Sequence, residues 1–179
     1  QNELKDKLRS EQSRLDAVES EIVLLQNIAN SHEAFPASVQ YLLEEKNRFS
    51  HLDVLSDIFS TEEKYAVALE SVLGEAVNYL AVDSVDDARK GIGLLKQEDK
   101  GKATFIPMEV ISDNHQVTSG SIYEKVKADA RYDRLKKLLL GNVMVFETMD
   151  EGMKYCRQNP SVTGVTLKGD VITAQQFMR

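Results

Sequence analysis

The sequence Asn-Tyr-Leu-Ala-Val-Asp-Ser-Val-Asp-Asp-Ala at residues 78–88 has a counterpart, Asn-Val-Met-Val-Phe-Glu-Thr-Met-Asp-Glu-Gly, at residues 142–152. The last six positions of the two stretches match in chemical type without a gap: an acid, a hydroxyl residue, an apolar residue, Asp, an acid and a small residue. Each stretch opens on an apolar run that favours a strand. Ser84 or Thr148 can then accept a backbone N–H bond at the start of a helix, with an acid three residues later. Both stretches therefore predict a strand-to-helix junction.

A second β-rich run follows each predicted helix, at residues 103–106 in the first half and at residues 164–167 in the second. A single strand-helix-strand unit cannot bury both faces of so small a sheet, so two copies packed about a pseudo-two-fold axis are the expected solution. The predicted fold class is α/β (mixed α+β), with two pseudo-symmetric strand-helix-strand halves. The alternative is a coincidence between two ordinary capped helices, because such capping sequences are common.

Composition indicates an ordinary folded domain. The chain has 179 residues, of which 42% are hydrophobic and 28% charged, and its formal net charge is −7. This net negative charge argues against a protein whose whole surface binds phosphate groups. The single cysteine, Cys156, excludes an intrachain disulfide and fits a reducing compartment, and its spacing from Met153 predicts a buried residue rather than a nucleophile. No run reaches the roughly 20 apolar residues of a membrane helix, and the chain is expected to be a segment of a longer protein.

The first 33 residues predict a coiled-coil arm. Apolar residues recur there at spacings that alternate between four and three, with Glu11 in the one gap, and this is the seam of a left-handed coiled coil. Its partner helix could belong to another chain or to a part of the parent chain that returns after residue 179, or the arm could pack on the globular part as a single amphipathic helix. The seam residues are Leu4, Leu8, Leu15, Val18, Ile22 and Leu25.

Phe35-Pro36 ends the arm, because the residue before a proline is disfavoured in a helix. Residues 34–179 are then expected to form one domain, with a first half at about 50–111, a connector at about 112–121 and a second half at about 122–179. Within it the sequence predicts a helix that Ser60 begins through a capping box, a strand at 76–82, helix over 121–140 as one piece or two, and a hairpin turn at Lys168-Gly169.

No catalytic or metal-binding arrangement is evident in the sequence. The three histidines, His32, His51 and His115, have no second ligand at metal spacing. No G-x-x-x-x-G-K-[ST] run occurs, and Gly91-Ile92-Gly93 lies inside a predicted helix, where a phosphate-binding turn cannot form. The acidic pairs in the first turns of the two repeat helices favour the helix dipole, and a catalytic dyad is the alternative. No cofactor is expected.

A group of basic residues lies close together in the sequence, although the net charge of the chain is negative. It has two interpretations: a solvated helix laced with i,i+4 pairs such as Asp133 with Lys137, or a nucleic-acid contact surface. Tyr123 and Tyr132 are the only aromatic residues among these cations, so base stacking has little support. The cations are Lys125, Lys127, Arg131, Arg134, Lys136 and Lys137.

Three short motifs, in order, carry a resemblance to a known family. They are Glu63-Lys64-Tyr65-Ala66-Val67-Ala68-Leu69-Glu70-Ser71-Val72-Leu73-Gly74, Lys102-Ala103-Thr104-Phe105-Ile106-Pro107 and Val165-Thr166-Leu167-Lys168-Gly169-Asp170. Together with the heptad arm they resemble the hinge domain of structural maintenance of chromosomes (SMC) proteins, in particular that of the bacterial members. The resemblance covers nearly the whole chain from about residue 35 to residue 172.

The resemblance implies a non-enzymatic hinge at the end of a long antiparallel coiled coil, in a cytoplasmic, nucleoid-associated protein whose ATPase heads lie elsewhere. It also implies a homodimer joined partly at sheet edges, a returning coiled-coil helix from the parent chain, and DNA contacts at basic surfaces. The dimer residues expected on this basis are Val165, Leu167, Gly169 and Ile172.

Two departures from the family pattern stand out. His51-Leu52 replaces a histidine-glycine pair, and residues 173–179 lack the family's glycine-rich run. A rival hypothesis is a small-molecule-binding or enzymatic α/β domain with a coiled-coil dimerisation arm. It predicts a polar pocket where the strand ends meet.

Overall fold

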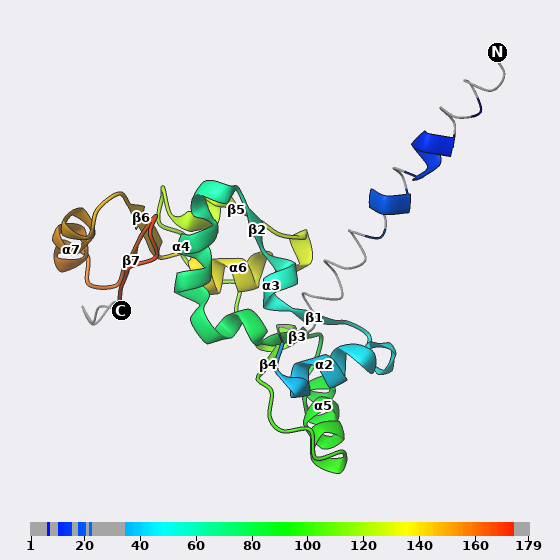
Figure 1. Cartoon of the computed structure of the whole chain (residues 1–179). Coiled ribbons are helices and arrows are strands. Elements are labelled where there is room, and N and C mark those ends of the chain that lie inside the picture. The colour runs from blue at the N-terminus through cyan, green and yellow to red at the C-terminus, as the bar shows by residue number, and fades with distance from the viewer. Residues whose placement is uncertain (1–6, 8–10, 16–17, 21, 23–34, 174–179) are drawn as a thin grey trace.

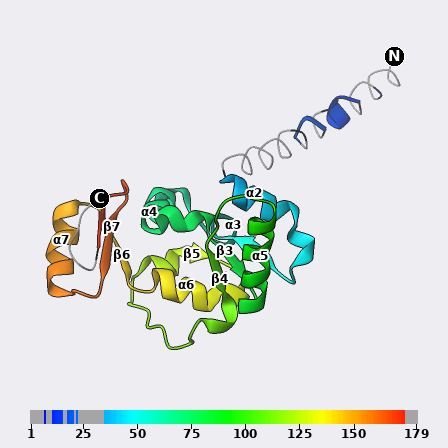
Figure 2. The ribbon, with the colours of Figure 1, turned by 90° about the horizontal axis from the view of Figure 1, so that it is seen from below.

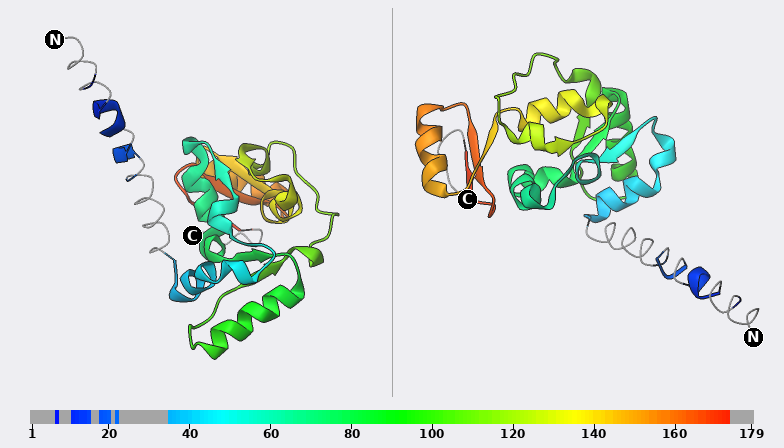
Figure 3. Two further views of the ribbon diagram at one scale, coloured as in Figure 1. Left: turned by 90° about the vertical axis from the view of Figure 1, so that its right-hand side faces the viewer. Right: turned by 90° about the horizontal axis from the view of Figure 1, so that it is seen from above.

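The computed structural model describes residue 7, residues 11–15, 18–20 and 22, and then residues 35–173 without a break. The body is elongated, with a three-stranded sheet towards each end (Figure 1, Figure 2). Strand β1 and helices α2 and α5 lie towards one end, β6, β7 and α7 form the other, and α4 and α6 lie between them. The described residues of the arm lie away from this body (Figure 3).

The first half is organised around strand β3. It pairs with β1 in the antiparallel sense and with β4 in the parallel sense. The elements of this half, in chain order, are α2 (Ala37–Glu44), η1 (Lys46–Arg48), β1 (Leu52–Val54), α3 (Leu55–Ile58), β2 (Ser60–Thr61), α4 (Glu63–Leu73), η2 (Gly74–Asn78), β3 (Leu80–Val82), α5 (Val85–Gln97), β4 (Phe105–Pro107) and η3 (Met108–Val110).

The second half is organised around strand β7. It pairs with β6 in the parallel sense and with β8 in the antiparallel sense. The elements are η4 (Ile122–Lys125), β5 (Val126–Lys127), η5 (Ala130–Tyr132), α6 (Asp133–Leu140), β6 (Val143–Phe146), α7 (Met149–Gln158), β7 (Thr163–Thr166) and β8 (Val171–Ile172). A two-stranded antiparallel sheet of β2 and β5 joins the halves.

The predicted duplication is confirmed as two parallel strand-helix-strand units, β3-α5-β4 and β6-α7-β7. The Ser84 hydroxyl oxygen accepts a bond from the Asp87 N–H at 3.1 Å, and Thr148 accepts one from Glu151 at 3.3 Å. The symmetry stops at the third strand. In the first half β1 flanks the strand before the helix, whereas in the second half β8 flanks the strand after it.

Two local predictions were wrong, and both errors involve the small sheet of β2 and β5. Ser60 does not cap a helix, because it pairs with Lys127 in this sheet, and α4 begins at Glu63 instead. Residues 121–140 are not α-helical before Asp133, either as one piece or as the first of two, because Val126 is extended and buried against the first half; only Asp133–Leu140 is α-helix. The strand predicted at 76–82 is also shorter, since η2 occupies its first residues.

Alternating residues of each outer sheet enter different hydrophobic clusters. In β3, Leu80 and Val82 pack with α5 and α2 in a cluster confined to the first half, while Ala81 faces the opposite side. In the second half Ile172 packs with Cys156 of α7, whereas Val165 faces the centre. Each repeat helix therefore covers one face of its sheet, and the two remaining faces contribute to a common core.

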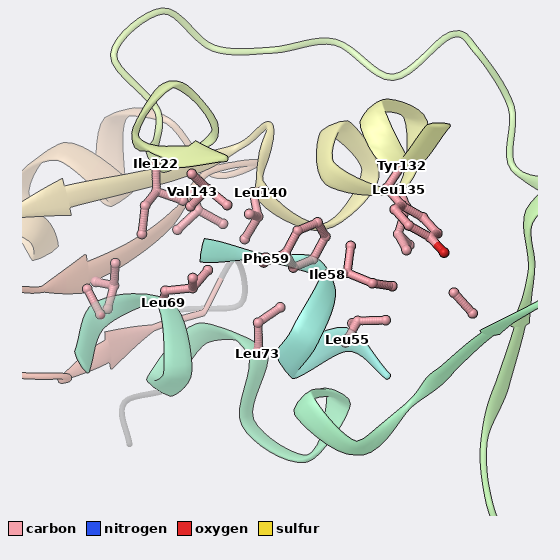
Figure 4. Close-up of a cluster of buried hydrophobic side chains, with 14 of the residues drawn as sticks. Leu55, Ile58, Phe59, Leu69, Leu73, Ile122, Tyr132, Leu135, Leu140 and Val143 are labelled. Carbon is pink, nitrogen blue, oxygen red and sulfur yellow. The ribbon is translucent and has the colours of Figure 1, made fainter. Parts of the chain in front are cut away.

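This shared core lies between the halves (Figure 4). It is larger than the cluster internal to either half, and both halves supply fully buried side chains to it. Its buried members are Leu55, Ile58, Phe59, Ala68, Leu69, Leu73, Ala81, Met108 and Ile111 from the first half, and Ile122, Val126, Tyr132, Leu135, Leu140, Val143, Val165 and Val171 from the second.

The shared core predicts that alanine substitutions at two leucines of α6 will lower the stability of the protein by very different amounts. Leu135 is fully buried and Leu138 is 46% exposed. We expect Leu135→Ala to lower the free energy of unfolding by about 2–5 kcal/mol, because burial is removed and a cavity remains, and Leu138→Ala by about 0.5 kcal/mol or less. Urea denaturation measures both. Equal effects of the two substitutions would contradict a core shared by the halves at α6.

Candidate interaction surfaces

The hairpin of β7 and β8 has a strand edge that no other strand of the described chain covers. The turn is closed by Gly169, whose φ of +96° suits glycine, and the Thr166 N–H donates to the Asp170 carbonyl at 2.9 Å. This confirms the predicted hairpin. Among the described residues, no strand pairs with the outer side of β8. An unpaired edge of this kind can accept a strand from another chain.

The four residues expected at a dimer interface divide into two kinds. Val165 and Ile172 are 0% and 2% exposed within the chain itself, so their side chains are already packed in the shared core and against α7. Leu167 and Gly169 are only partly buried, at the end of β7 and in the turn. A partner could therefore reach the backbone edge of β8, Leu167 and the turn, but not the side chains of Val165 and Ile172.

The hairpin turn packs on helix α4. A Cβ atom placed on Gly169 would lie 2.5 Å from the Ser71 Oγ and 3.1 Å from a methyl carbon of Val67. Val67 is itself 50% exposed. Tyr65, Phe146 and Leu167 line a small cavity of about 170 Å³ nearby. We call Tyr65, Val67, Phe146 and Leu167 the hairpin patch. The sequence analysis did not identify Val67 as a surface residue of interest. The one signal for it in the sequence is that an apolar residue lies away from the buried face of α4.

Arg131 and Arg134 are engaged within the chain. The Arg131 guanidinium lies 2.6 Å from an Asp83 carboxylate oxygen. Arg134 donates to the Ile111 carbonyl at 3.0 Å and lies 3.5 Å from the Asp113 carboxylate. These cations stabilise contacts inside the molecule and are partly neutralised there.

Lys136 and Lys137 are also engaged, whereas Lys125 and Lys127 are exposed. Lys136 donates to the Val126 carbonyl at 3.0 Å and lies over the Tyr123 ring. Lys137 forms the predicted pair with Asp133 at 2.7 Å, and this bond, followed by one from the Tyr123 hydroxyl, lowers the Asp133 pKa. No ionic partner of the Lys125 or Lys127 side chain is found in the described part of the chain. The six cations thus do not form one helical surface.

A polar cluster fastens η5 to the first sheet, and the sequence did not predict it. One Asp83 carboxylate oxygen binds Arg131, and the other lies 2.7 Å from the His51 Nδ1. Asp53 of β1 accepts a bond from Lys46 at 2.7 Å and another from the Tyr132 hydroxyl. We call these six residues the inter-half bridge. The signal that could have found it was His51, a titratable residue immediately before β1.

Two groups of the inter-half bridge have shifted pKa values. Burial by itself would raise the Asp53 pKa, but the bonds from Lys46 and Tyr132 outweigh it and lower that pKa. Burial, followed by the bond to Asp53, raises the pKa of Tyr132 well above its usual range. Asp53 therefore stays ionised and Tyr132 stays a hydrogen-bond donor near neutral pH.

The described part of the arm carries an exposed apolar stripe. Leu15, Val18 and Ile22 are helical, follow the predicted spacing and are 59%, 50% and 47% exposed. Leu4, Leu8 and Leu25 lie outside the described residues. The stripe is therefore available to a second helix.

The described residues include no group of three side chains suited to hold a metal ion. A cavity of about 560 Å³ between α3, α4 and η2 is lined by apolar residues together with Ser56, Ser60, Thr61, Glu70 and Asn78, and its described lining contains no paired acid and base. None of the described helices has both the length and the apolar character needed to cross a membrane.

Comparison with known proteins gives concordant matches. The family SMC proteins Flexible Hinge Domain matches residues 49–156. The chromosome partition protein Smc of Methanocaldococcus jannaschii is 28% identical over 95% of this chain, and that of Bacillus subtilis is 30% identical over 83%. The matched regions are only 15% and 14% of those two proteins. An asymmetric dimer of the Geobacillus stearothermophilus SMC hinge domain matches with a TM-score of 0.80 and 25% identity, covering 92% of this chain and 73% of that one.

The inter-half bridge predicts a pH-dependent stability difference. Because the folded-state pKa of Asp53 is lowered, its contribution is present above the unfolded pKa of about 4 and is lost as pH falls through the folded value. We expect Asp53→Asn to lower the free energy of unfolding by about 1 kcal/mol at pH 7. Urea denaturation should show this gap from the wild type shrinking at pH 3.

Asp86→Asn is the matched control, because the Asp86 side chain is 89% exposed and its ion pair with Arg89 is 3.2 Å long. This control should stay within about 0.5 kcal/mol of the wild type at both pH values. A gap for Asp53→Asn that is the same at pH 7 and pH 3 would contradict the role assigned to its charge.

Proposed function

This chain belongs to the family of SMC protein flexible hinge domains, and on that premise we propose that it is a non-enzymatic dimerisation hinge joining the coiled-coil arms of a chromosome-organising protein. The observation that carries this proposal is that no strand within residues 35–173 pairs with the outer edge of β8, beside the partly exposed hairpin patch. Similarity to a hinge domain that forms an asymmetric dimer supports it.

Two copies of the chain would associate through this edge. Backbone N–H and C=O groups on the outer side of β8 would pair with an edge strand of the second copy, and the hairpin patch would bury apolar surface beside them. Val165 and Ile172 would act indirectly, by holding β7 and β8 in shape from within. Leu167 and Gly169 would lie at the contact itself.

The arm would connect the hinge to the rest of the parent protein. Its exposed stripe of Leu15, Val18 and Ile22 would pack against a returning helix of the same protein as an antiparallel coiled coil. The parent protein would be an ATPase through head domains in other parts of its chain. It would act at the nucleoid in the cytoplasm, as the chromosome partition proteins it resembles suggest.

A second function, contact with DNA, is favoured at a smaller site than the sequence indicated. Lys125 and Lys127 are exposed in the η4-β5 segment, and Lys64 lines the same cavity as Lys125. By contrast Arg131, Arg134, Lys136 and Lys137 are engaged in contacts within the chain. We propose that any phosphate contact is made by Lys125 and Lys127, and that it is weak because the whole chain carries a net charge of −7.

Dimerisation can be tested by placing a charge on the hairpin patch. We expect Val67→Asp to raise the dimer dissociation constant by about tenfold or more, since a charge would be buried without a partner. Val110→Asp is the control, because Val110 is 64% exposed in η3. Sedimentation velocity over a concentration series measures both. A wild type that stays monomeric at tens of micromolar, or equal effects of the two variants, would argue against this interface.

DNA binding can be tested by a salt titration with a fluorescent duplex. The double variant Lys125→Glu/Lys127→Glu should bind more weakly, and the slope of log affinity against log salt should fall by about 2, because each of the two lysines would neutralise roughly one phosphate. Lys154→Glu on α7 is a single-charge control that should leave the slope unchanged. An unchanged slope in the double variant would exclude this site.

A further inference from the structure

The end of helix α5 and the segment that leads from it into β4 enclose a groove with a volume of about 530 Å³. The groove lies in the outer part of the first half, and α5 is far from β6, β7 and α7 of the second half (Figure 1, Figure 2). Residues 98–104 form neither helix nor strand, so one wall is helical and the other is irregular. We call this site the α5 groove.

The apolar part of the α5 groove can be reached by another molecule. Ile92 is 42% exposed, whereas Leu95, on the same helix, is 3% exposed and belongs to the core of the first half. Ala103, on the irregular wall, is partly buried. An apolar side chain that enters the groove would cover Ile92, and removal of this surface from water favours binding.

The charged part of the α5 groove favours an acidic ligand. Lys96 and Lys102 are exposed, and neither forms an ion pair within residues 35–173. Asp99 contributes a carboxylate to the described lining, so the two lysines leave the groove positively charged. The whole chain carries a net charge of −7, which makes this groove a local exception. A ligand with carboxylates on either side of its apolar part would complement both lysines.

The backbone of the irregular wall favours a polypeptide ligand. The N–H groups of Gly101, Lys102 and Ala103 have no acceptor within residues 35–173. The segment itself is anchored, because the Lys102 carbonyl accepts a bond of 2.7 Å from the hydroxyl of Ser38 in α2. A fixed segment with unused N–H donors can pair with the backbone carbonyl groups of a bound peptide, as an exposed sheet edge does.

We propose that the α5 groove binds an extended peptide segment of a partner protein, in which apolar residues are flanked by acidic ones. The apolar side chains would contact Ile92 and Ala103, and the acids would pair with Lys96 and Lys102. Nucleic acid fits this groove less well, because its phosphates would meet the lysines but leave Ile92 uncovered. The proposal goes beyond the hinge function and does not depend on dimerisation through the β8 edge.

Fluorescence anisotropy with labelled peptides tests this proposal. The probes are fluorescein-labelled heptapeptides of the pattern Ser-Asp-X-X-X-Asp-Ser, in which X is Val, Leu, Ile or Phe, titrated with the 179-residue chain. We expect saturable binding of members of this set with dissociation constants below about 1 mM. Ile92→Ser and Lys102→Glu should each weaken that binding by about tenfold or more. Replacing both Asp residues of a binding peptide by Lys should abolish its binding.

Leu138→Ser on α6 and Lys154→Glu on α7 are the matched controls. Leu138 is 46% exposed, close to the value for Ile92, and Lys154 is an exposed lysine outside the groove. Both controls should bind the peptides as the wild type does. All four variants should keep the urea midpoint of the wild type, because each changes an exposed side chain. If Ile92→Ser lowers that midpoint, Lys102→Glu decides alone.

Four results would overturn the proposal: no member of the peptide set binds, the groove and control variants weaken binding equally, a short DNA duplex displaces the peptide, or the peptide dissociates a dimer in sedimentation. The third would identify a phosphate-binding surface, and the fourth would identify a second copy of the chain as the occupant. A chain that dimerises but binds no peptide would contradict this proposal alone. A chain that binds the peptide but stays monomeric would contradict the hinge function alone.

Discussion

The hydrophobic core shared by the two halves is the constraint on which the rest of the structure depends. Each outer sheet has three short strands, and helices cover only one of its faces: α5 with α2 in the first half, and α7 in the second. The uncovered faces contribute Ala81 from one side and Val143 and Val165 from the other to one common core. Because burial of apolar surface is the main favourable term in folding, neither half is complete alone. This core sets the orientation of the two halves relative to each other. It therefore also sets the position of each surface described above.

Electrostatic contacts also stabilise the junction between the two halves. They engage much of the positive charge of the basic residues between 125 and 137. Arg131 reaches across to Asp83, and Tyr132 reaches Asp53. Lys137 binds Asp133, and Lys136 binds the carbonyl of Val126 in the strand that joins the halves. The contacts of Arg131 and Tyr132 hold η5 against the first sheet, although each is individually modest. The contacts of Lys136 and Lys137 lie within the second half. Most of the cations that look like a nucleic-acid surface in the sequence therefore make contacts inside the molecule.

The surfaces left open by this packing are those that the proposed hinge would use. The outer edge of β8, the hairpin patch around Val67, and the stripe of Leu15, Val18 and Ile22 each present hydrogen-bonding or apolar groups to solvent. A rigid body with several open edges is suited to join other polypeptide, because association then costs little conformational entropy within the body itself.

The sequence by itself determined the two strand-helix-strand units, their caps at Ser84 and Thr148, the hairpin at Gly169 and the family, because each depends on local spacing and on short motifs. Only the tertiary structure decided that Ser60 and Val126 lie in two paired strands, that Val165 and Ile172 face inward, and that Arg131 binds Asp83. Asp83 and Arg131 are 48 residues apart in the chain. Contacts over such separations are set by how the halves pack, and no local pattern of residue types records that packing.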